Sequence, residues 1–218
     1  YRLVDFGQEH LGQKGKVSSI EYDPYRNAFI ALIQYEDGKK GYLICPQDVK
    51  VADEIVCQDK AQVRPGNRMR LEYIPVGTMV YNIELLAGQG GKLVRSAGVG
   101  AKVLASEGGY THLQLPSTEV RKVSGKCFAS VGMVSNPGFM YEKDHKAGTT
   151  RWKGRRPSVR GTAMNPVDHP HGGGEGRQPR GMHPKTPWGK PAFGVKTRKK
   201  SRWTRKLIIQ RRQKKKKV

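Results

Sequence analysis

The spacing of apolar residues limits what this chain can fold into. In the first 150 residues, apolar residues occur in short segments separated by glycine, proline and aspartate. Such segments suit β-strands, because a helix with one buried face needs a longer run with a period of about 3.6 residues. Only a stretch near residues 136–146 suits a helix, and a short one. The chain is therefore predicted to be all-β.

The first five segments fit an OB-fold barrel. The Asp37-Gly38 pair separates two of them and predicts a hairpin, because glycine adopts a positive φ without steric cost. Five short strands within residues 1–60 match a small Greek-key barrel of the OB type, which often binds oligonucleotides. The expected strands are residues 1–6, 16–22, 28–35, 41–44 and 54–57.

A second series of segments follows Pro65-Gly66 and fits an SH3-like barrel over residues 61–135. Gly108-Gly109 and Pro116-Ser117 predict two of its turns. Because barrels of this size are marginally stable alone, we expect the two barrels to pack together or against a partner. The expected strands are residues 78–85, 101–106, 110–114, 119–123 and 127–131.

The charge of the chain is concentrated after the barrels. The chain has 41 Lys and Arg residues against 18 Asp and Glu residues, a net charge of +23. Residues 151–218 carry +20 of this charge, and residues 1–150 carry +3. Only eight Leu, Ile, Val or Phe residues occur in residues 151–218, too few to offset the entropy of ordering by burial. We therefore expect residues 136–218 to form a long, basic, extended C-terminal segment that becomes ordered on its partner.

This charge indicates a polyanionic partner, with nucleic acid as the first candidate and an anionic membrane surface as the second. The longest apolar run, residues 28–33, is far shorter than the roughly 20 residues of a membrane span, so we expect a soluble chain with no membrane partner. Cys45, Cys57 and Cys127 are widely spaced. This spacing favours small buried side chains in a reducing compartment over disulfides or a zinc site.

Residues 88–100 contain five glycines interleaved with Lys92 and Arg95. They do not match a nucleotide-phosphate motif. We favour a loop whose bare backbone approaches RNA phosphates, with the two cations adding charge. A plain flexible loop is the alternative.

Residues 151–177 are the most informative segment. Their cations offer phosphate contacts, and Trp152 offers a stacking face for an unpaired base. Prolines stiffen this backbone, and Gly172, Gly173 and Gly174 remove side chains where we expect the chain to pass closest to its partner. The candidate RNA-binding residues of the whole chain are Arg64, Arg68, Lys92, Arg95, Arg151, Trp152, Lys153, Arg155, Arg156, Arg160, Asn165, Asp168, His169, His171, Arg177, Trp188, Lys199, Lys200, Arg202, Arg205, Arg211 and Arg212.

A metal or acid/base site is an alternative for Asp168, His169, His171 and Glu175, since Asp beside His often orients an imidazole. However, the two histidines lie in a segment rich in proline and glycine, without a rigid scaffold or a third ligand at the usual spacing. We therefore favour hydrogen bonds to RNA bases, 2′-hydroxyls or ordered ions, with Asp168 orienting an imidazole. No catalytic residue, no protein-held metal and no cofactor is expected, apart from Mg²⁺ associated with RNA.

Residues 198–217 form a basic run broken by Leu207-Ile208-Ile209. We favour a solvated tail that neutralises phosphates, with a nuclear localisation signal as the alternative. For the whole chain, a chromatin or general nucleic-acid-binding protein and a metal-dependent hydrolase stay open beside a binder of structured RNA. The two barrels with Trp152 and Trp188 favour the RNA binder.

Several motifs resemble a known family. They are YRLVDF at the start, EYDP from Glu21, IPVG from Ile74, RRPSVRGTAMNPVDHPHGGGEGR from Arg155 and HPKTPWGKP from His183. Together with the order of barrels and basic tail, they resemble the bacterial and organellar type of the large-subunit ribosomal protein L-two family over essentially the whole chain. Two features depart from the family pattern: several tens of residues usually precede the Tyr1 equivalent, and Gly98-Val99-Gly100 differs.

The resemblance implies a structural constituent of the large ribosomal subunit rather than an enzyme. It implies a primary rRNA-binding protein that supports subunit assembly, association with the small subunit and the peptidyl-transferase region, with catalysis left to RNA. Its partners would be large-subunit rRNA, other large-subunit ribosomal proteins and the small subunit. The His that matches His169 has been proposed to be functionally important in the family. We expect location on a ribosome, with a mitochondrion or plastid slightly favoured over a bacterial cytoplasm because of the Lys-rich end and the missing start.

Overall fold

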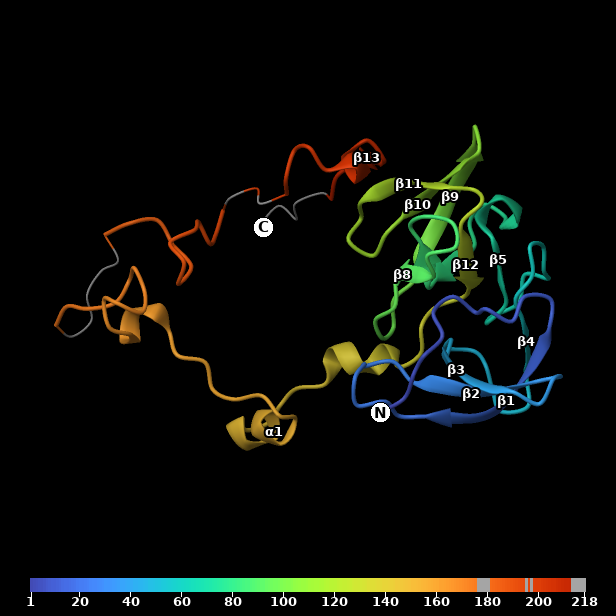
Figure 1. The fold of residues 1–218 in the computed structure, drawn as a ribbon, viewed down its shortest axis with the longest axis horizontal. Coiled ribbons are helices and arrows are strands. Elements are labelled where there is room, and N and C mark those ends of the chain that lie inside the picture. Colours follow the sequence, from blue (N-terminus) through green and yellow to red (C-terminus); the bar gives the residue numbers. More distant parts are fainter. Residues whose placement is uncertain (176–180, 195, 197, 213–218) are drawn as a thin grey trace. The chain divides into compact units, whose positions relative to one another are not determined.

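The computed structural model describes residues 1–175, 181–194, 196 and 198–212 (Figure 1). It divides into two compact units, which are treated separately below. The first contains Tyr1–Glu142 together with the described residues from Trp203 onward, and the second is Lys143–Arg202. The first unit is built almost entirely from β-strands, as expected for an OB-fold barrel followed by an SH3-like barrel.

The first barrel is an antiparallel sheet with the strand order β3-β2-β1-β4. Its hairpin at Asp37-Gly38 is confirmed, since Gly38 has a φ of 81° and Asp37 Oδ1 accepts the N–H of Lys39. Its core contains Val17, Ile33 and Leu43. The strands are β1 (Lys14–Glu21), β2 (Ile30–Tyr35), β3 (Lys40–Ile44) and β4 (Glu54–Val56).

The expected strand at residues 1–6 is wrong. The backbone of this segment forms one isolated bridge, between Val4 and Tyr42, and no further ladder among the described residues, although the Arg2 side chain also pairs with Glu21 of β1. Directly afterwards, the Asp5 carboxylate accepts the backbone N–H groups of Gly7 and Gln8 and turns the chain away. A side chain that competes for backbone donors in this way ends the strand geometry.

The second barrel is a seven-stranded sheet with the order β13-β11-β10-β9-β6-β12-β5. The hairpin at Gly108-Gly109 and the turn at Pro116-Ser117 are confirmed. The strand expected over residues 78–85 is split, because Asn82 adopts a φ of 48° between β6 and β7. The strands are β5 (Arg68–Arg70), β6 (Met79–Tyr81), β9 (Ala101–Glu107), β10 (Tyr110–Gln114), β11 (Val120–Ser124), β12 (Phe128–Val131) and β13 (Ile208–Gln210), with β7 (Ile83–Glu84) and β8 (Gly91–Leu93) as a separate pair.

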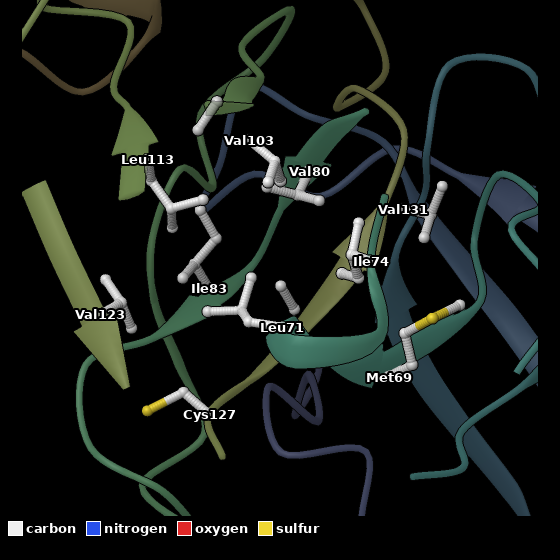
Figure 2. Packing of buried hydrophobic residues seen from close by; sticks show 12 residues of the cluster. Met69, Leu71, Ile74, Val80, Ile83, Val103, Leu113, Val123, Cys127 and Val131 are labelled. Carbon is white, nitrogen blue, oxygen red and sulfur yellow. The ribbon is translucent and has the colours of Figure 1, made fainter. Parts of the chain in front are cut away.

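Aliphatic side chains from this sheet and from the turn after β5 fill the core of the second barrel (Figure 2). Leu71, Ile83 and Leu113 are fully buried. Cys127 lies in this core, and Cys45 and Cys57 are also buried and free, as expected. Burial raises the pKa of the Cys45 and Cys127 thiols to about 11, so these thiols stay protonated near neutral pH.

The two barrels pack together, which confirms the expectation from their size. A shared apolar cluster joins Ala28 and Ile44 of the first barrel to Tyr81 and Val134 of the second. Backbone hydrogen bonds support it, for example from Ser135 N–H to the Cys45 carbonyl at 3.0 Å. Apolar burial and backbone pairing therefore hold the barrels as one body.

Short helices complete the described chain. The segment near residues 136–146 forms only the 3-10 turn η2. None of the helices in the described ranges is long and apolar enough to span a membrane. The helices are η1 (Leu71–Tyr73), η2 (Pro137–Tyr141), α1 (Ala147–Trp152), η3 (Gly161–Ala163) and η4 (Trp203–Arg205).

Part of the C-terminal basic run pairs with the second barrel. Strand β13 pairs with β11 at the edge of the second barrel (Figure 1), and the N–H of Lys122 donates to the Leu207 carbonyl at 2.7 Å. The apolar triplet Leu207-Ile208-Ile209 interrupts the charge and supplies residues with high strand propensity. The C-terminal run therefore returns to the first unit.

Candidate nucleic-acid interface

The second unit presents a row of exposed cations. Arg155, Arg156 and Arg160 have exposed side chains, and none of them forms an ion pair with any described residue. They occupy a segment without regular structure that follows α1. Cations without carboxylate partners are free to bind phosphate groups, because no internal salt bridge has to be broken.

Helix α1 supplies a further cation and an aromatic side chain. Trp152 is 75% exposed, and the ammonium of Lys146 lies 4.8 Å from the centre of its ring. Lys153 pairs with Asp144 at 2.7 Å, so this lysine is partly neutralised. Arg151 is exposed on the same helix. The helix therefore displays Trp152 and Arg151 as the groups available to a base and a phosphate.

Trp188 occupies the tip of a short loop. An isolated bridge pairs Lys185 with Pro191, and the N–H of Thr186 donates to the Lys190 carbonyl at 2.8 Å. Trp188 itself is 80% exposed. A large aromatic ring at the tip of a closed loop suits stacking on an unpaired base.

Residues 161–174 fold around His169, which is only 6% exposed. The Asn165 carbonyl accepts the N–H groups of Asp168 and His169 at 3.0 and 3.2 Å. The His169 carbonyl accepts the N–H of Gly172 at 2.8 Å. This part of the basic segment therefore has its own hydrogen-bonded structure, which its composition did not predict.

The glycines of this loop are required by packing within the chain. A Cβ atom on Gly161 would lie 2.5 Å from the His169 ring, and one on Gly172 would lie 2.3 Å from the Asn165 carbonyl oxygen. Gly173 has a φ of 85° and faces Pro166. Packing within the loop therefore explains Gly172 and Gly173, in place of the close approach of a partner that the sequence predicts there.

The imidazoles of His169 and His171 accept hydrogen bonds from the backbone. His169 Nδ1 accepts the N–H of His171 at 3.0 Å, and His171 Nε2 accepts the N–H of Lys185 at 3.2 Å. In their neutral forms, the rings therefore carry their protons on Nε2 of His169 and Nδ1 of His171. Asp168 is exposed, and the hydrogen bonds shown for the two rings come from backbone groups instead.

Within the described ranges, no group of three or more His, Cys, Asp or Glu side chains is placed to hold a metal ion. The ring nitrogens of His169 and His171 that face the chain are already used as acceptors. These hydrogen bonds fix the shape of the loop.

The glycine-rich loop at residues 88–100 also packs within the chain. A Cβ atom on Gly90 would lie 3.3 Å from the backbone nitrogen of Gly7, and one on Gly98 would lie 2.6 Å from the Cα atom of Pro137. The N–H of Gly91 donates to the Phe6 carbonyl at 2.9 Å. A Cβ atom on Gly91 would also clash with Asn82, and one on Gly100 would lie 2.8 Å from the Met79 side chain, so packing within the chain accounts for four of the five glycines.

The two cations of this loop differ in their surroundings. The Arg95 guanidinium lies 4.3 Å from the centre of the Phe6 ring and donates to the Gly91 carbonyl at 3.2 Å. Arg95 therefore helps to hold the loop. Lys92 is exposed and donates to Gln89 Oε1 at 3.2 Å. It stays available to a phosphate group.

Arg68 does not belong to the interface. Its side chain is fully buried, Nη1 donates to the Asn82 carbonyl at 2.7 Å, and Nη2 donates to Glu84 Oε1 at 3.0 Å. A buried, ion-paired guanidinium cannot reach a phosphate group. The prediction for Arg68 is therefore wrong, because the sequence does not show that a carboxylate sixteen residues away is its partner.

The other predicted residues are exposed, apart from one that lies outside the described part of the chain. Arg64 is exposed on the turn before β5. Arg177 lies outside the described residues. The remaining side chains at the C-terminal end are all exposed, namely Lys199, Lys200, Arg202, Arg205, Arg211 and Arg212.

Sequence reasoning missed one surface of the first barrel. Tyr22 and Tyr25 are 68% and 69% exposed on the loop between β1 and β2. Buried Asp23 shapes this loop by accepting the Tyr25 N–H and pairing with Arg26. Exposure of tyrosine cannot be read from a short apolar segment, because tyrosines also occupy barrel cores.

Comparison with known proteins identifies the family. A family model described as "Ribosomal Proteins L2, RNA binding N-terminal domain" matches residues 1–57, and one described as "Ribosomal Proteins L2, C-terminal domain" matches residues 64–189. The two matches together cover most of the chain and meet between the two barrels.

Three relatives carry the name "Large ribosomal subunit protein uL2". The protein of Rhodospirillum rubrum is 52% identical over 212 residues, which are 97% of this chain and 76% of the relative. The protein of Methylocella silvestris is 52% identical over 217 residues, 100% of this chain and 78% of the relative. The protein of Gluconacetobacter diazotrophicus is 53% identical over 212 residues, 97% of this chain and 76% of the relative.

These relatives bear on the remaining predictions. They are named as proteins of the large ribosomal subunit and not as enzymes, which confirms the expectation of a ribosomal constituent rather than an enzyme. They are bacterial and give no support to the preference for an organelle. With both domain models matched in order and about half of its residues identical to these proteins, this chain belongs to the uL2 family, whose members are RNA-binding structural constituents of the large ribosomal subunit.

Proposed function

We propose that this chain holds large-subunit rRNA through the exposed cations and tryptophans of its second unit. It thereby supports assembly of the large subunit, its association with the small subunit and the peptidyl-transferase region. The observation that carries the proposal is the row of Arg155, Arg156 and Arg160, exposed and without ion pairs among the described residues. The resemblance of the surrounding motifs to the family supports the finer roles.

The chemistry of binding is electrostatic with added stacking. Each guanidinium that neutralises a phosphate releases condensed counterions, so affinity falls as salt rises. Trp152 and Trp188 add stacking on unpaired bases, worth about 1–3 kcal/mol for each base. Stacking does not depend on counterion release. The two contributions to affinity can therefore be separated by measuring binding at several salt concentrations.

The role near the peptidyl-transferase region is positional. The loop around His169 is closed by its own hydrogen bonds, and its exposed rim includes Asn165 and Asp168. We assign to it the presentation of a fixed surface to rRNA, with Mg²⁺ held by the RNA and not by protein ligands. Proton transfer is left to the RNA.

The experiment measures binding of the full chain to large-subunit rRNA between low and moderate salt. Arg155→Ala with Arg156→Ala should weaken binding and lower the slope of log affinity against log salt by roughly one to two, since each lost phosphate contact removes nearly one unit. The matched control is Lys102→Ala with Lys126→Ala, which removes two exposed cations from the second barrel. An unchanged slope in the arginine variant, or an equal change in the control, contradicts the assignment.

A further inference from the structure

The loop between β1 and β2 presents aromatic rings to solvent. Tyr22 and Tyr25 are 68% and 69% exposed on this loop. The ring of Tyr1, itself 92% exposed, has its centre 5.8 Å from that of Tyr25. None of the roles assigned above uses this tyrosine surface, which consists of Tyr1, Tyr22 and Tyr25. Exposed apolar groups gathered in one place often mark an interaction site.

Asp23 fixes the backbone between the two loop tyrosines. Its side chain is fully buried, its Oδ1 accepts the Tyr25 N–H at 2.9 Å, and its carboxylate pairs with Arg26. The Arg26 guanidinium in turn lies 5.3 Å from the centre of the Phe6 ring. The loop therefore has a fixed shape, and presenting the Tyr25 ring to a partner costs little conformational entropy.

Arg2 holds the other end of the loop. Its Nη1 donates to the Tyr22 carbonyl at 3.2 Å, and its Nη2 pairs with Glu21 Oε2 at 3.0 Å. The Tyr42 hydroxyl donates to the same Glu21 oxygen at 3.2 Å, and the Arg2 guanidinium lies 5.6 Å from the centre of the Tyr42 ring. The backbone of Tyr22 is therefore anchored, while its side chain stays exposed.

The charges around the tyrosine surface are balanced within the chain. Residues 21–29 contain two carboxylates, Glu21 and Asp23, which pair with Arg2 and Arg26. These carboxylates therefore do not repel RNA, and the two guanidinium groups are already engaged. In contrast to the exposed arginines of the second unit, this loop offers rings and not charge to a partner.

Two considerations favour RNA as the occupant of the tyrosine surface. The family model that matches residues 1–57 describes an RNA-binding domain. The loop between the first two strands is also one through which OB-fold barrels bind oligonucleotides. Because every base has a π face, exposed tyrosines suit unpaired nucleotides without requiring a particular sequence.

We propose that Tyr22 and Tyr25 stack on unpaired bases of large-subunit rRNA, an inference that rests on the proposed function. Tyr1 packs against Tyr25 and limits the motion of that ring. The first barrel thus binds bases, while the exposed arginines of the second unit bind phosphates.

Binding of the full chain to large-subunit rRNA tests the proposal. Tyr22→Ala with Tyr25→Ala should weaken binding at least roughly tenfold, because a stacked base contributes about that much affinity for each ring. Tyr22→Leu with Tyr25→Leu keeps apolar bulk without a π face and should show a similar loss. Tyr22→Phe with Tyr25→Phe keeps both rings and should bind within roughly twofold of the unsubstituted chain. The slope of log affinity against log salt should be the same in all of these chains, since no phosphate contact is lost.

The matched control is Tyr110→Ala, which removes a tyrosine that is 43% exposed on the second barrel and should leave the affinity unchanged. Because both loop tyrosines are exposed, the midpoint of urea unfolding should be unchanged in every variant. Unchanged affinity in the alanine and leucine variants, an equal loss in the phenylalanine variant or in the control, or a lower salt slope would each overturn the proposal.

Other outcomes separate this proposal from its alternatives. If the alanine variant binds rRNA normally but assembles poorly with the other large-subunit proteins, the occupant is a protein and the proposal is overturned. The proposed function fails when the unsubstituted chain does not bind rRNA, or when the Arg155 and Arg156 variant keeps its salt slope. The present inference fails on the tyrosine variants alone, so the two failures are distinguishable.

Discussion

Arg68 and Glu84 form an ion pair inside the second barrel, with Arg68 Nη2 3.0 Å from Glu84 Oε1. Both side chains are almost completely excluded from solvent. Glu84 also accepts the N–H groups of Gly88 and Phe128, so the pair ties β5 and β7 to β12 and to the glycine-rich loop. Such a network stabilises one arrangement of the sheet only while every member is present.

Removal of one member should therefore be severe. Arg68→Ala leaves a buried carboxylate without its cation and should lower the free energy of unfolding by about 3–5 kcal/mol. Arg64→Ala, which removes an exposed arginine four residues earlier, should change it by less than about 0.5 kcal/mol. Urea unfolding of the full chain measures both values, and equal effects would show that Arg68 is not a core residue.

The same two arginines show how far the sequence could predict the interface. Both are basic residues in the polar stretch between the barrels, and nothing local separates them. Arg68 is buried because β5 pairs with β12, about sixty residues later in the chain. By contrast, hairpins such as Asp37-Gly38 depend on neighbouring residues, and the sequence predicted them correctly.

The glycines show the same contrast between local conformation, which the sequence predicts, and contacts with distant residues, which it does not. Their φ values and turns are local, but the atoms that exclude a Cβ at Gly90 and Gly98 come from Gly7 and Pro137. The sequence therefore showed that bare backbone was needed without showing which surface approached it. The loop around His169 was missed for a related reason, since low apolar content says nothing of backbone hydrogen bonds.

That loop should depend on Gly161. In Gly161→Ala the new methyl group would meet the buried His169 ring at 2.5 Å, so the ring must move and lose its hydrogen bond from His171. We expect loss of amide protection over residues 163–173 and reduced incorporation into large subunits. Gly148→Ala in α1 is the control, since its nearest contact would be an ordinary 3.9 Å, and it should retain both properties.

The role of His169 can be divided by choosing the replacement. His169→Asn places an acceptor oxygen near the position of Nδ1 and should keep most of the hydrogen bond from His171, worth about 1 kcal/mol. His169→Gln places its amide further out and should lose that bond. In both variants the free energy of unfolding of the barrels should be unchanged. The activity of the large subunit should fall more in His169→Gln than in His169→Asn. Wild-type assembly and translation in both variants would refute a special role for His169.

Acid should weaken the loop between β1 and β2 through Asp23. Burial tends to raise the pKa of Asp23, but the Tyr25 N–H and the Arg26 guanidinium outweigh it and hold the pKa below its usual value. The folded state thus binds this proton less readily than the unfolded state, whose pKa is about 3.9. The stabilisation is present above that pH and is lost as pH falls through the lower folded value. Unfolding of the wild type and Asp23→Asn at several pH values should show their difference shrinking below about pH 4, and a constant difference would contradict the assignment.

Strand β13 should stabilise the edge of the second barrel. The N–H of Lys122 donates to the Leu207 carbonyl at 2.7 Å, and Ile208 pairs with Arg121 in the ladder. A chain ending at Lys206 loses these contacts, so the amide of Lys122 should exchange with solvent much faster and the free energy of unfolding should fall by roughly 1–2 kcal/mol. A chain ending at Arg212 loses charge but keeps β13, and it should retain the protection of that amide. Equal exchange at Lys122 in the two truncated chains would mean that the terminal strand does not hold this edge, and the stability difference should then vanish as well.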